Sequence, residues 1–153
     1  MEGRLLKKYG ESNHRPYQCF MGKWEGLCKT FSVEGQFIES TPVHMDVYWT
    51  DDQSWHLYEH FENLYEVGNT VFDTDIKVEG KCCYASNDMI SLDGRELTPY
   101  NYVFNIESKV SKTLVLNNHY FIDPNTRRII THKMRGGKSH VFQIQDFVRI
   151  IQP

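Results

Sequence analysis

The stretch FMGKWEGLCKTFS, residues 20–32, carries the alternation that decides the architecture of the chain. If the side chain of Trp24 points inward, the two-residue period of a β-strand places a row of small residues beside it: Gly22, Gly26, Cys28 and Thr30. Charged residues alternate with this row and face water: Lys23, Glu25 and Lys29. The stretch therefore predicts a strand with one buried face, and its small inner side chains predict free space beside that face.

The rest of the chain repeats this strand pattern. Runs rich in Val, Ile, Tyr, Phe and Thr are separated by short turn signals such as Glu34-Gly35, Asp93-Gly94 and Gly136-Gly137. The runs predict strands near residues 22–32, 36–49, 54–62, 70–79, 81–86, 89–92, 95–107, 111–121, 128–135 and 139–151. Nearly every connection is too short for a crossover helix, so these strands are expected to pair antiparallel with their sequence neighbours.

A row of that many strands exposes two long edges unless the sheet closes on itself. The sequence therefore predicts an all-β fold, a single closed antiparallel up-and-down barrel of about 8–10 strands. The whole chain, residues 1–153, is expected to form one domain, because its length suits one. Residues 1–19 precede the first strand and are expected to form a short N-terminal helix or an arm that plugs one end of the barrel.

The composition is that of a globular protein without a general affinity for polyanions. Hydrophobic residues make up 40% of the chain and charged residues 24%, which excludes a disordered or collagen-like chain. The net charge of −3 gives no general attraction to nucleic acid or to anionic membranes. No apolar run has the length of a signal peptide or a membrane span, so we expect a cytoplasmic protein. The aromatic content of 14% is typical of a large core or a ligand cavity.

The sequence motifs predict neither a metal site nor a cofactor. No zinc spacing is found among the four cysteines, which are predicted to be reduced thiols: Cys19, Cys28, Cys82 and Cys83. His56 and His60 are four residues apart, but on a strand that spacing is roughly 13 Å, too far for one ion. The stretch 136–139, Gly-Gly-Lys-Ser, lacks the spacing of a phosphate-binding loop and is followed by a strand.

Both ends of the strand region resemble the lipocalin and calycin superfamily. The start of the first strand, Gly22-Lys23-Trp24, is similar to the Gly-x-Trp signature of that superfamily, in which an Arg on the last strand packs on the Trp. The last strand, SHVFQIQDFVRIIQ, offers Arg149 at the matching place. The resemblance implies that Trp24 and Arg149 are structural residues, in contact through a cation–π interaction at one end of the barrel. The run GKWEGLCKTFSVEGQFIESTP also resembles the opening of an uncharacterised cyanobacterial lipocalin-like family related in fold to bilin lyases.

Alternation along the other predicted strands places a mainly apolar set of side chains inside the barrel. On the last strand, the phase of Arg149 carries the amides of Gln143 and Gln145 inward, although the opposite phase is more apolar. Buried amides need hydrogen-bond partners, which water or a ligand in a cavity can supply. An apolar lining with a few polar groups is typical of a small-molecule pocket. The predicted ligand-binding residues are Trp55, Leu57, Phe72, Tyr100, Phe104, Met134, Gln143 and Gln145.

The same alternation brings a candidate acid–base pair into the predicted cavity. Glu59 and His132 each stand alone as an ionisable group in an apolar inward row, and burial would move the pKa of both toward neutrality. The hydroxyl of Tyr102 is a third candidate catalytic group, because it could polarise a carbonyl. The alternative is a polar network that only satisfies itself inside the barrel. His119 lies near a predicted barrel mouth, and its direction is ambiguous.

Three functions stay open at this point, and the third is a pure interaction module, which would show a filled core and an exposed patch. The first is an intracellular small-molecule-binding barrel that holds one hydrophobic or aromatic ligand, pigment- or lipid-like, in its cavity. The second is an isomerase, cyclase or lyase without a metal, which acts on a small hydrophobic substrate by acid–base chemistry in the same barrel. Because fold does not decide between them, the site must. The sequence favours binding, with a small hydrophobic molecule as the partner, no nucleic acid and no membrane, and it leaves a homodimer open.

Overall fold

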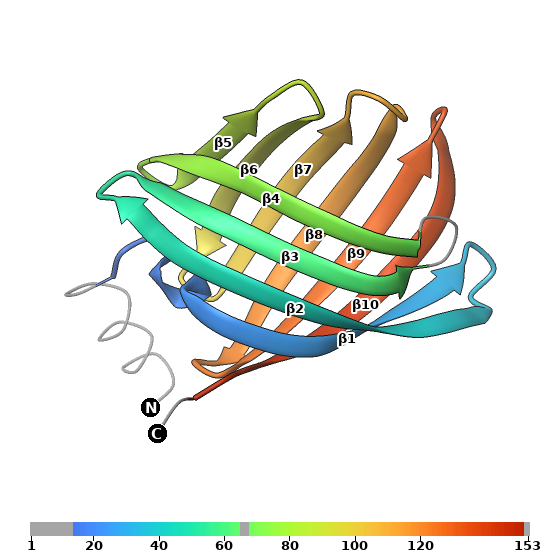
Figure 1. The fold of residues 1–153 in the computed structure, drawn as a ribbon, viewed down its shortest axis with the longest axis horizontal. Helices are drawn as coiled ribbons and strands as arrows, with labels where there is room; N and C mark the ends of the chain where they lie inside the picture. The colour runs from blue at the N-terminus through green and yellow to red at the C-terminus, as the bar shows by residue number, and fades with distance from the viewer. Residues whose placement is uncertain (1–13, 65–67, 152–153) are drawn as a thin grey trace.

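Strands account for nearly all of the regular structure. The computed structural model describes residues 14–64 and 68–151 (Figure 1). A 3-10 turn, η1 (Gln18–Phe20), precedes ten strands: β1 (Gly22–Ser32), β2 (Phe37–Asp51), β3 (Ser54–Leu64), β4 (Gly68–Glu79), β5 (Cys82–Ser86), β6 (Ile90–Thr98), β7 (Asn101–Ser108), β8 (Thr113–Asp123), β9 (Thr126–Arg135) and β10 (Lys138–Arg149). None of the described residues belongs to a helix with the length and apolar character needed to cross a bilayer.

The ten strands form one closed antiparallel up-and-down barrel, which confirms the predicted fold (Figure 1). Each strand pairs with its neighbours in sequence, and β1 closes the ring by pairing antiparallel with β10. This last pairing sets Trp24 opposite Arg149 and Cys28 opposite Gln145. Because the ring is closed, the described strands present no long free edge to solvent.

The burial of β1 follows the predicted alternation, but its small inner residues do not border free space. Trp24 and Cys28 are fully buried, and the charged residues that alternate with them, Lys23, Glu25 and Lys29, are exposed. A side chain on Gly26 would meet the backbone oxygen of Asp146 at 2.1 Å and the ring of Phe147 at 2.7 Å. The expectation of free space at Gly26 is therefore wrong, because a ring from β10 fills the place that the missing side chain leaves.

One end of the barrel is closed by Trp24 and Arg149. The indole is fully buried, and its Nε1 donates to the carbonyl oxygen of Phe20 at 2.9 Å. The guanidinium carbon of Arg149 lies 4.3 Å from the centre of the indole ring. The Nη2 group of Arg149 donates to the carbonyl oxygens of Cys19 at 2.9 Å and Pro124 at 3.1 Å. The guanidinium therefore ties together β10, the segment before β1 and the turn between β8 and β9.

The segment before β1 fills this end as a plug. Tyr17 is fully buried, and the centre of its ring lies 5.1 Å from that of Tyr102. Phe20, in η1, packs edge-on against the same Tyr102 ring, with the ring centres 4.8 Å apart. The predicted arm is thus present in residues 14–19, and residues 1–13 of it lie outside the described part of the chain.

One predicted turn in the middle of the chain is wrong. The sequence places a hairpin turn at Asp93-Gly94 and a long strand over residues 95–107, but β6 runs straight through Gly94. The turn falls instead at Pro99-Tyr100, between β6 and β7. A Cβ on Gly94 would come within 2.5 Å of the ring of Phe104. This glycine is present because a ring packs closely against the backbone, and it does not reverse the chain.

Replacing Trp24 by alanine is expected to lower the free energy of unfolding by about 3–5 kcal/mol, because the change removes a fully buried ring that the surrounding wall cannot collapse to fill. The control is Leu27→Ala on the same strand, whose side chain is 48% exposed and which we expect to cost less than about 1 kcal/mol. Urea denaturation followed by circular dichroism measures both losses. Similar losses in the two variants would contradict the role given to Trp24.

Candidate functional site

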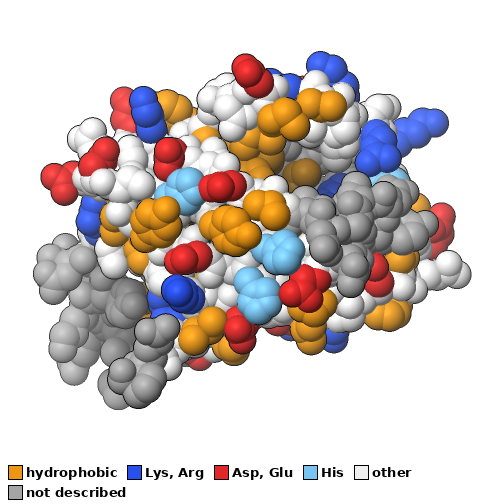
Figure 2. All heavy atoms as spheres, viewed as in Figure 1, with side chains coloured by type: hydrophobic (Ala, Val, Ile, Leu, Met, Phe, Trp, Pro, Cys, Tyr) orange, Lys and Arg blue, Asp and Glu red, His pale blue; other side chains and the backbone are white. Residues whose placement is uncertain are grey.

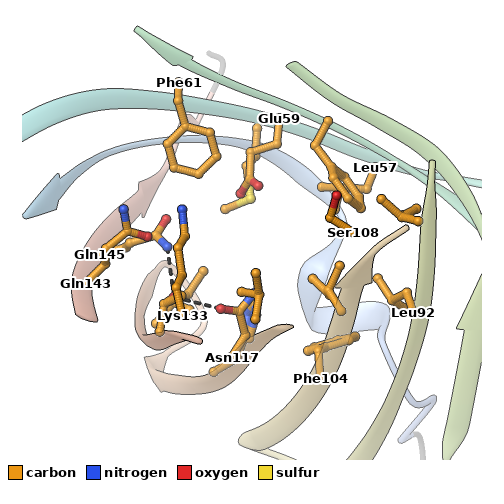
Figure 3. A pocket seen from close by; sticks show the side chains of 18 of the residues that line it. Leu57, Glu59, Phe61, Leu92, Phe104, Ser108, Asn117, Lys133, Gln143 and Gln145 are labelled. Carbon is orange, nitrogen blue, oxygen red and sulfur yellow. Dashed lines mark hydrogen bonds between the residues drawn. The ribbon is translucent and has the colours of Figure 1, made fainter. Parts of the chain in front are cut away.

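The barrel encloses a cavity of about 400 Å³ (Figure 3). The cavity begins at Phe20 and Trp55, next to the plug, and reaches Ser111 in the turn between β7 and β8. That turn lies at the end of the barrel opposite Trp24, since β7 runs away from the closed end. The cavity therefore occupies the part of the barrel that the plug leaves unfilled, and its size suits a small molecule.

The cavity lining divides into an apolar wall and a polar wall. The apolar wall consists of side chains from β3, β4, β6 and β7: Trp55, Leu57, Phe61, Phe72, Ile76, Ile90, Leu92, Phe104 and Ile106. The polar wall consists of the polar lining residues of β8, β9 and β10: Thr113, Asn117, His119, Arg127, Thr131, Lys133, Arg135, Gln143 and Gln145. Figure 3 shows Lys133, Gln143 and Gln145 on one side, with Glu59 and Phe61 facing them. A molecule in the cavity would meet carbon on one side and hydrogen-bonding groups on the other.

The amides of the polar wall are held in place by hydrogen bonds. The Nε2 of Gln145 donates to the hydroxyl of Thr131 at 3.1 Å, and that hydroxyl donates to Oδ1 of Asn117 at 2.7 Å (Figure 3). The Nε2 of Gln143 donates to the hydroxyl of Thr30 at 3.1 Å. These bonds satisfy one end of each glutamine and set its orientation, so the inward amides are part of a built wall.

Several polar atoms of the lining have no hydrogen-bond partner in the described part of the chain. Among the residues that the structure describes, the buried side-chain nitrogen and oxygen atoms without a hydrogen bond are Trp55 Nε1, His119 Nδ1, Arg127 Nε and Gln145 Oε1. All of these residues line the cavity. A buried polar atom without a partner costs free energy, and such atoms mark places where a ligand or water completes the structure.

Arg127 is the least expected residue of the lining. It is only 1% exposed, and its guanidinium carbon lies 4.5 Å from the centre of the Trp24 ring and 5.0 Å from that of Phe20. Its Nη2 donates to the sulfur of Met45 at 3.4 Å. Burial lowers the pKa of Arg127 to about 9, which leaves the guanidinium charged at neutral pH. The aromatic faces supply part of the stabilisation that water would give elsewhere.

Two further ionisable groups of the lining have altered proton affinities. Burial raises the pKa of Glu59 to about 7, and the positive charges of Arg127 and Lys133 oppose this rise. Burial also keeps the pKa of His119 well below its ordinary value, and the charge of Arg127 adds to that effect. At neutral pH the cavity therefore contains a neutral imidazole and a carboxyl group that is about half ionised.

Seven of the predicted site residues line the cavity. They are Glu59 and six of the predicted ligand-binding residues: Trp55, Leu57, Phe72, Phe104, Gln143 and Gln145. They come from β3, β4, β7 and β10, where Trp55, Phe104 and Gln143 are buried in the phase that alternation predicts. The structure thus brings both walls of the predicted pocket together.

The placement of His132 in the cavity is wrong. The buried residues of β9 are Arg127, Ile129 and Thr131, so His132 lies on the exposed outer face, where its ring centre is 6.2 Å from that of Phe142. The expected contact between Glu59 and His132 therefore does not exist. The error is one of phase, because β9 carries isoleucines at both of the adjacent positions 129 and 130.

Three other predicted residues lie outside the cavity lining. Tyr102 is fully buried within the plugged end, where burial raises the pKa of its hydroxyl group, and this hydroxyl donates to Glu96 at 3.3 Å. Tyr100 lies in the turn between β6 and β7, because that turn replaces the one expected at Asp93-Gly94. Met134 shares the outward phase of His132 and does not line the cavity.

A surface ion pair could have revealed the phase of β9 and with it the position of Arg127. Arg128 forms a two-pronged bond to Asp146, with Nε to Oδ1 at 2.7 Å and Nη2 to Oδ2 at 3.1 Å. Because Asp146 alternates with Gln145, an outward Asp146 requires an outward Arg128, and Arg127 then points inward. This cross-strand charge pair is the signal in the sequence that indicates the inward direction of Arg127.

His56 and His60 alternate along β3 with the cavity-lining residues Leu57, Glu59 and Phe61, so they lie on the outer face, as predicted. Figure 2 shows histidine side chains beside acidic ones on the surface of the molecule. Nδ1 of His56 lies 2.6 Å from Oδ1 of Asp75, and its Nε2 contacts Asp73. Partial burial lowers the pKa of His56, but the bonds to the two carboxylates outweigh this and raise it overall. Within residues 14–64 and 68–151, no three His, Cys, Asp or Glu side chains come together as a possible metal site.

Comparisons with known proteins show the fold. No protein-family model matches the chain, and no curated protein is significantly similar to it in sequence. The S-type phycobiliprotein lyase CPES from Guillardia theta has a TM-score of 0.68 and 12% identity, covering 90% of this chain and 92% of that one. A DUF3598-family protein from Nostoc punctiforme PCC 73102 has a TM-score of 0.72 and 11% identity, over 89% of this chain and 50% of its own. Rv2717c from M. tuberculosis has a TM-score of 0.61 and 10% identity, over 88% of this chain and 94% of its own.

These likenesses extend over nearly the whole chain, while the identities are low. They show that the chain shares its barrel with a bilin lyase and a cyanobacterial protein, as the resemblance of its two ends implies. The comparisons show the barrel fold alone, and what the cavity holds must be argued from its residues.

Glu59 is expected to make the protein less stable as the pH rises. Its pKa is about 7 in the folded protein and 4.5 ordinarily, so between these values the folded state binds more protons than the unfolded chain and stability falls with increasing pH. The accumulated loss above neutral pH is on the order of 3 kcal/mol. In Glu59→Gln this titration is absent, so its stability relative to wild type should increase from about pH 5 to about pH 8.

Urea denaturation at several pH values measures this difference. Glu107→Gln, at an exposed position of β7, is the matched control and should leave the pH dependence of wild type unchanged. A Glu59→Gln protein whose stability runs parallel to that of wild type across this range would show that Glu59 is not held in an unfavourable environment.

Proposed function

We propose that the chain is a small-molecule-binding barrel that holds one hydrophobic or aromatic ligand in its cavity. The observation that carries this proposal is the two-sided lining, in which aromatic and aliphatic side chains face a wall of oriented amides across about 400 Å³. Protein interiors are normally packed to the density of organic crystals. A space of this size with fixed polar groups along one side therefore favours the binding of a molecule.

The polar wall supports a ligand with polar atoms along one edge. Gln143 and Gln145 are oriented by their bonds to threonines, so little order has to be created when a ligand enters. The unpaired Gln145 Oε1 needs a donor, and the unpaired Trp55 Nε1 needs an acceptor. A flat conjugated molecule with such an edge would suit both walls. The likeness to a phycobiliprotein lyase is a reason to include pigments among the ligands to be tried.

An acid–base enzyme is the weaker proposal. The isomerase, cyclase or lyase chemistry expected from the sequence needs Glu59 and His132 in one space, and His132 lies on the outer face. Tyr102 is enclosed in the plug, away from the cavity lining. Of the three candidate catalytic residues only Glu59 lines the cavity, so the residues present favour binding over catalysis.

The proposal includes a cytoplasmic location and needs no second subunit. Cys19, Cys28, Cys82 and Cys83 are all free thiols, in keeping with a reducing compartment. The described lining comes from one chain, so a homodimer is not required to complete the cavity.

The neutral fluorophore N-phenyl-1-naphthylamine is expected to bind the wild-type protein with a Kd in the micromolar range, because its rings match the apolar wall. Its fluorescence, which rises in apolar surroundings, reports binding. In Leu57→Trp the added ring enters the cavity, and the affinity should fall by at least about tenfold.

Tyr58→Trp is the matched control, since it adds a ring at the next residue of the same strand but on the exposed face. It should bind the fluorophore as wild type does. Circular dichroism checks that both variants keep the barrel. Undiminished binding by a folded Leu57→Trp protein would mean that the fluorophore sits elsewhere, and the proposed function would then fail.

A further inference from the structure

Arg127 is a buried charge at the cavity, and none of the residues that the structure describes provides a counter-ion for it. We propose that the cavity selects an apolar molecule that carries an acidic group, and that the anionic oxygens of this group bind the guanidinium of Arg127. The inference rests on the proposed function and names the class of its ligand. A carboxylate, a sulfonate or a phosphate would supply the same charged oxygens.

The surroundings of Arg127 leave its charge unbalanced. The guanidinium carbon lies within 5.7 Å of the ring centres of four aromatic residues: Phe20, Trp24, Phe121 and Phe147. Among the described residues no carboxylate is within ion-pair distance of it. Its one hydrogen bond in that part of the chain goes to the thioether of Met45, a weak acceptor, and its Nε is unpaired. Buried arginines are almost always paired with an anion, because an uncompensated charge is costly.

The position of Arg127 allows an anion to reach it. The residue lines the cavity, so a molecule held between the two walls can bring an oxygen to the guanidinium from that side. Arg127 itself is only 1% exposed, and a charged hydrogen bond is stronger at a buried site than in water. The apolar wall would hold the carbon body of the same molecule, and the amides of Gln143 and Gln145 its remaining polar atoms.

The pKa of the Glu59 carboxyl group, which lines the same cavity, depends on the charge of Arg127. Each acts on the other through its charge, but they are not in ion-pair contact, and Glu59 with a pKa of about 7 is only about half ionised at neutral pH. A bound anion would cancel the positive charge that favours ionised Glu59 and add a negative one. Glu59 would then take up a proton, so the affinity for an anion should rise as the pH falls through 7.

The other charged and titratable groups around Glu59 do not produce this pH dependence. Lys133, from β9, acts on Glu59 as a second positive charge and lowers its pKa. His119, from β8, is kept neutral by burial, and burial raises the pKa of the Cys28 thiol, from β1, to about 12. Near neutral pH the imidazole of His119 therefore stays neutral and the Cys28 thiol stays protonated, whereas Glu59 changes its charge.

The first test compares two probes with the same aromatic body. 8-Anilinonaphthalene-1-sulfonate carries a sulfonate that stays ionised across neutral pH, and N-phenyl-1-naphthylamine is its neutral counterpart. At pH 7 the wild-type protein should bind the sulfonate at least about tenfold more tightly than the neutral probe, as expected for a charged hydrogen bond in a water-poor site. Equal or weaker binding of the sulfonate overturns the proposal.

The second test removes the charge. Arg127→Met should abolish the preference for the sulfonate, measured as the ratio of the affinities of the two probes for the same variant, so that the sulfonate no longer binds more tightly than the neutral probe. The matched control is Arg128→Met, which removes an arginine from the next position of β9, on the outer face, and should keep the full preference. A folded Arg127→Met protein that still prefers the sulfonate overturns the assignment of Arg127.

The third test uses the wild-type protein, so it can be carried out even if Arg127→Met does not fold. From about pH 8 to about pH 6, the affinity of wild type for the sulfonate should rise about fivefold, while that for the neutral probe stays level. In Glu59→Gln the affinity for the sulfonate should be high and independent of pH. A flat profile in wild type overturns the coupling to Glu59.

These outcomes separate the inference from the proposed function. If the neutral probe binds in the cavity and the sulfonate gains nothing, the ligand class is wrong and the binding function stands. If Leu57→Trp weakens neither probe, both bind outside the cavity and the binding function itself is wrong.

Discussion

The closure of the barrel between β1 and β10 is the constraint on which the rest of the structure depends. It aligns Trp24 with Arg149, whose guanidinium covers the indole and bonds to carbonyl groups of the flanking segments. It also sets the phase of β10, and therefore the direction of Gln143 and Gln145. A shift of one residue would turn both amides to solvent and bring Phe142 and its outward neighbours inside, because side chains alternate along a strand.

The plug divides the barrel into a filled part and a hollow part. Tyr17, Phe20 and Trp55 pack their rings together at the closed end, with Tyr102 against them. Large aromatic side chains bury much surface each, so this cluster provides a core. The remaining space need not be filled for the chain to fold. The cavity is therefore compatible with a stable barrel, although an empty space always forgoes packing energy.

Three polar features of the cavity work against stability. Within the described part of the chain Arg127 is buried without a counter-ion and Gln145 Oε1 lacks a donor, and Glu59 ionises only at a cost. A chain optimised for stability alone would place apolar side chains at these positions. Groups that are unfavourable in the isolated protein but complementary to one kind of molecule are typical of a binding site.

The sequence alone was enough for the strand order, the barrel closure and the direction of β1, β3 and β10, because single anchors such as Trp24 set the phase of an alternating strand. For the same reason, the sequence also predicted several residues of the apolar wall, among them Trp55, Leu57 and Phe104. The sequence could not decide which face of β9 points inward, because the adjacent Ile129 and Ile130 give both faces an apolar residue. The prediction therefore placed His132 inside the barrel, where the structure has Arg127. Alternation is a local property of one strand, whereas the choice of inner face depends on the register with its neighbours. Only the tertiary structure supplies that register, and with it the buried arginine.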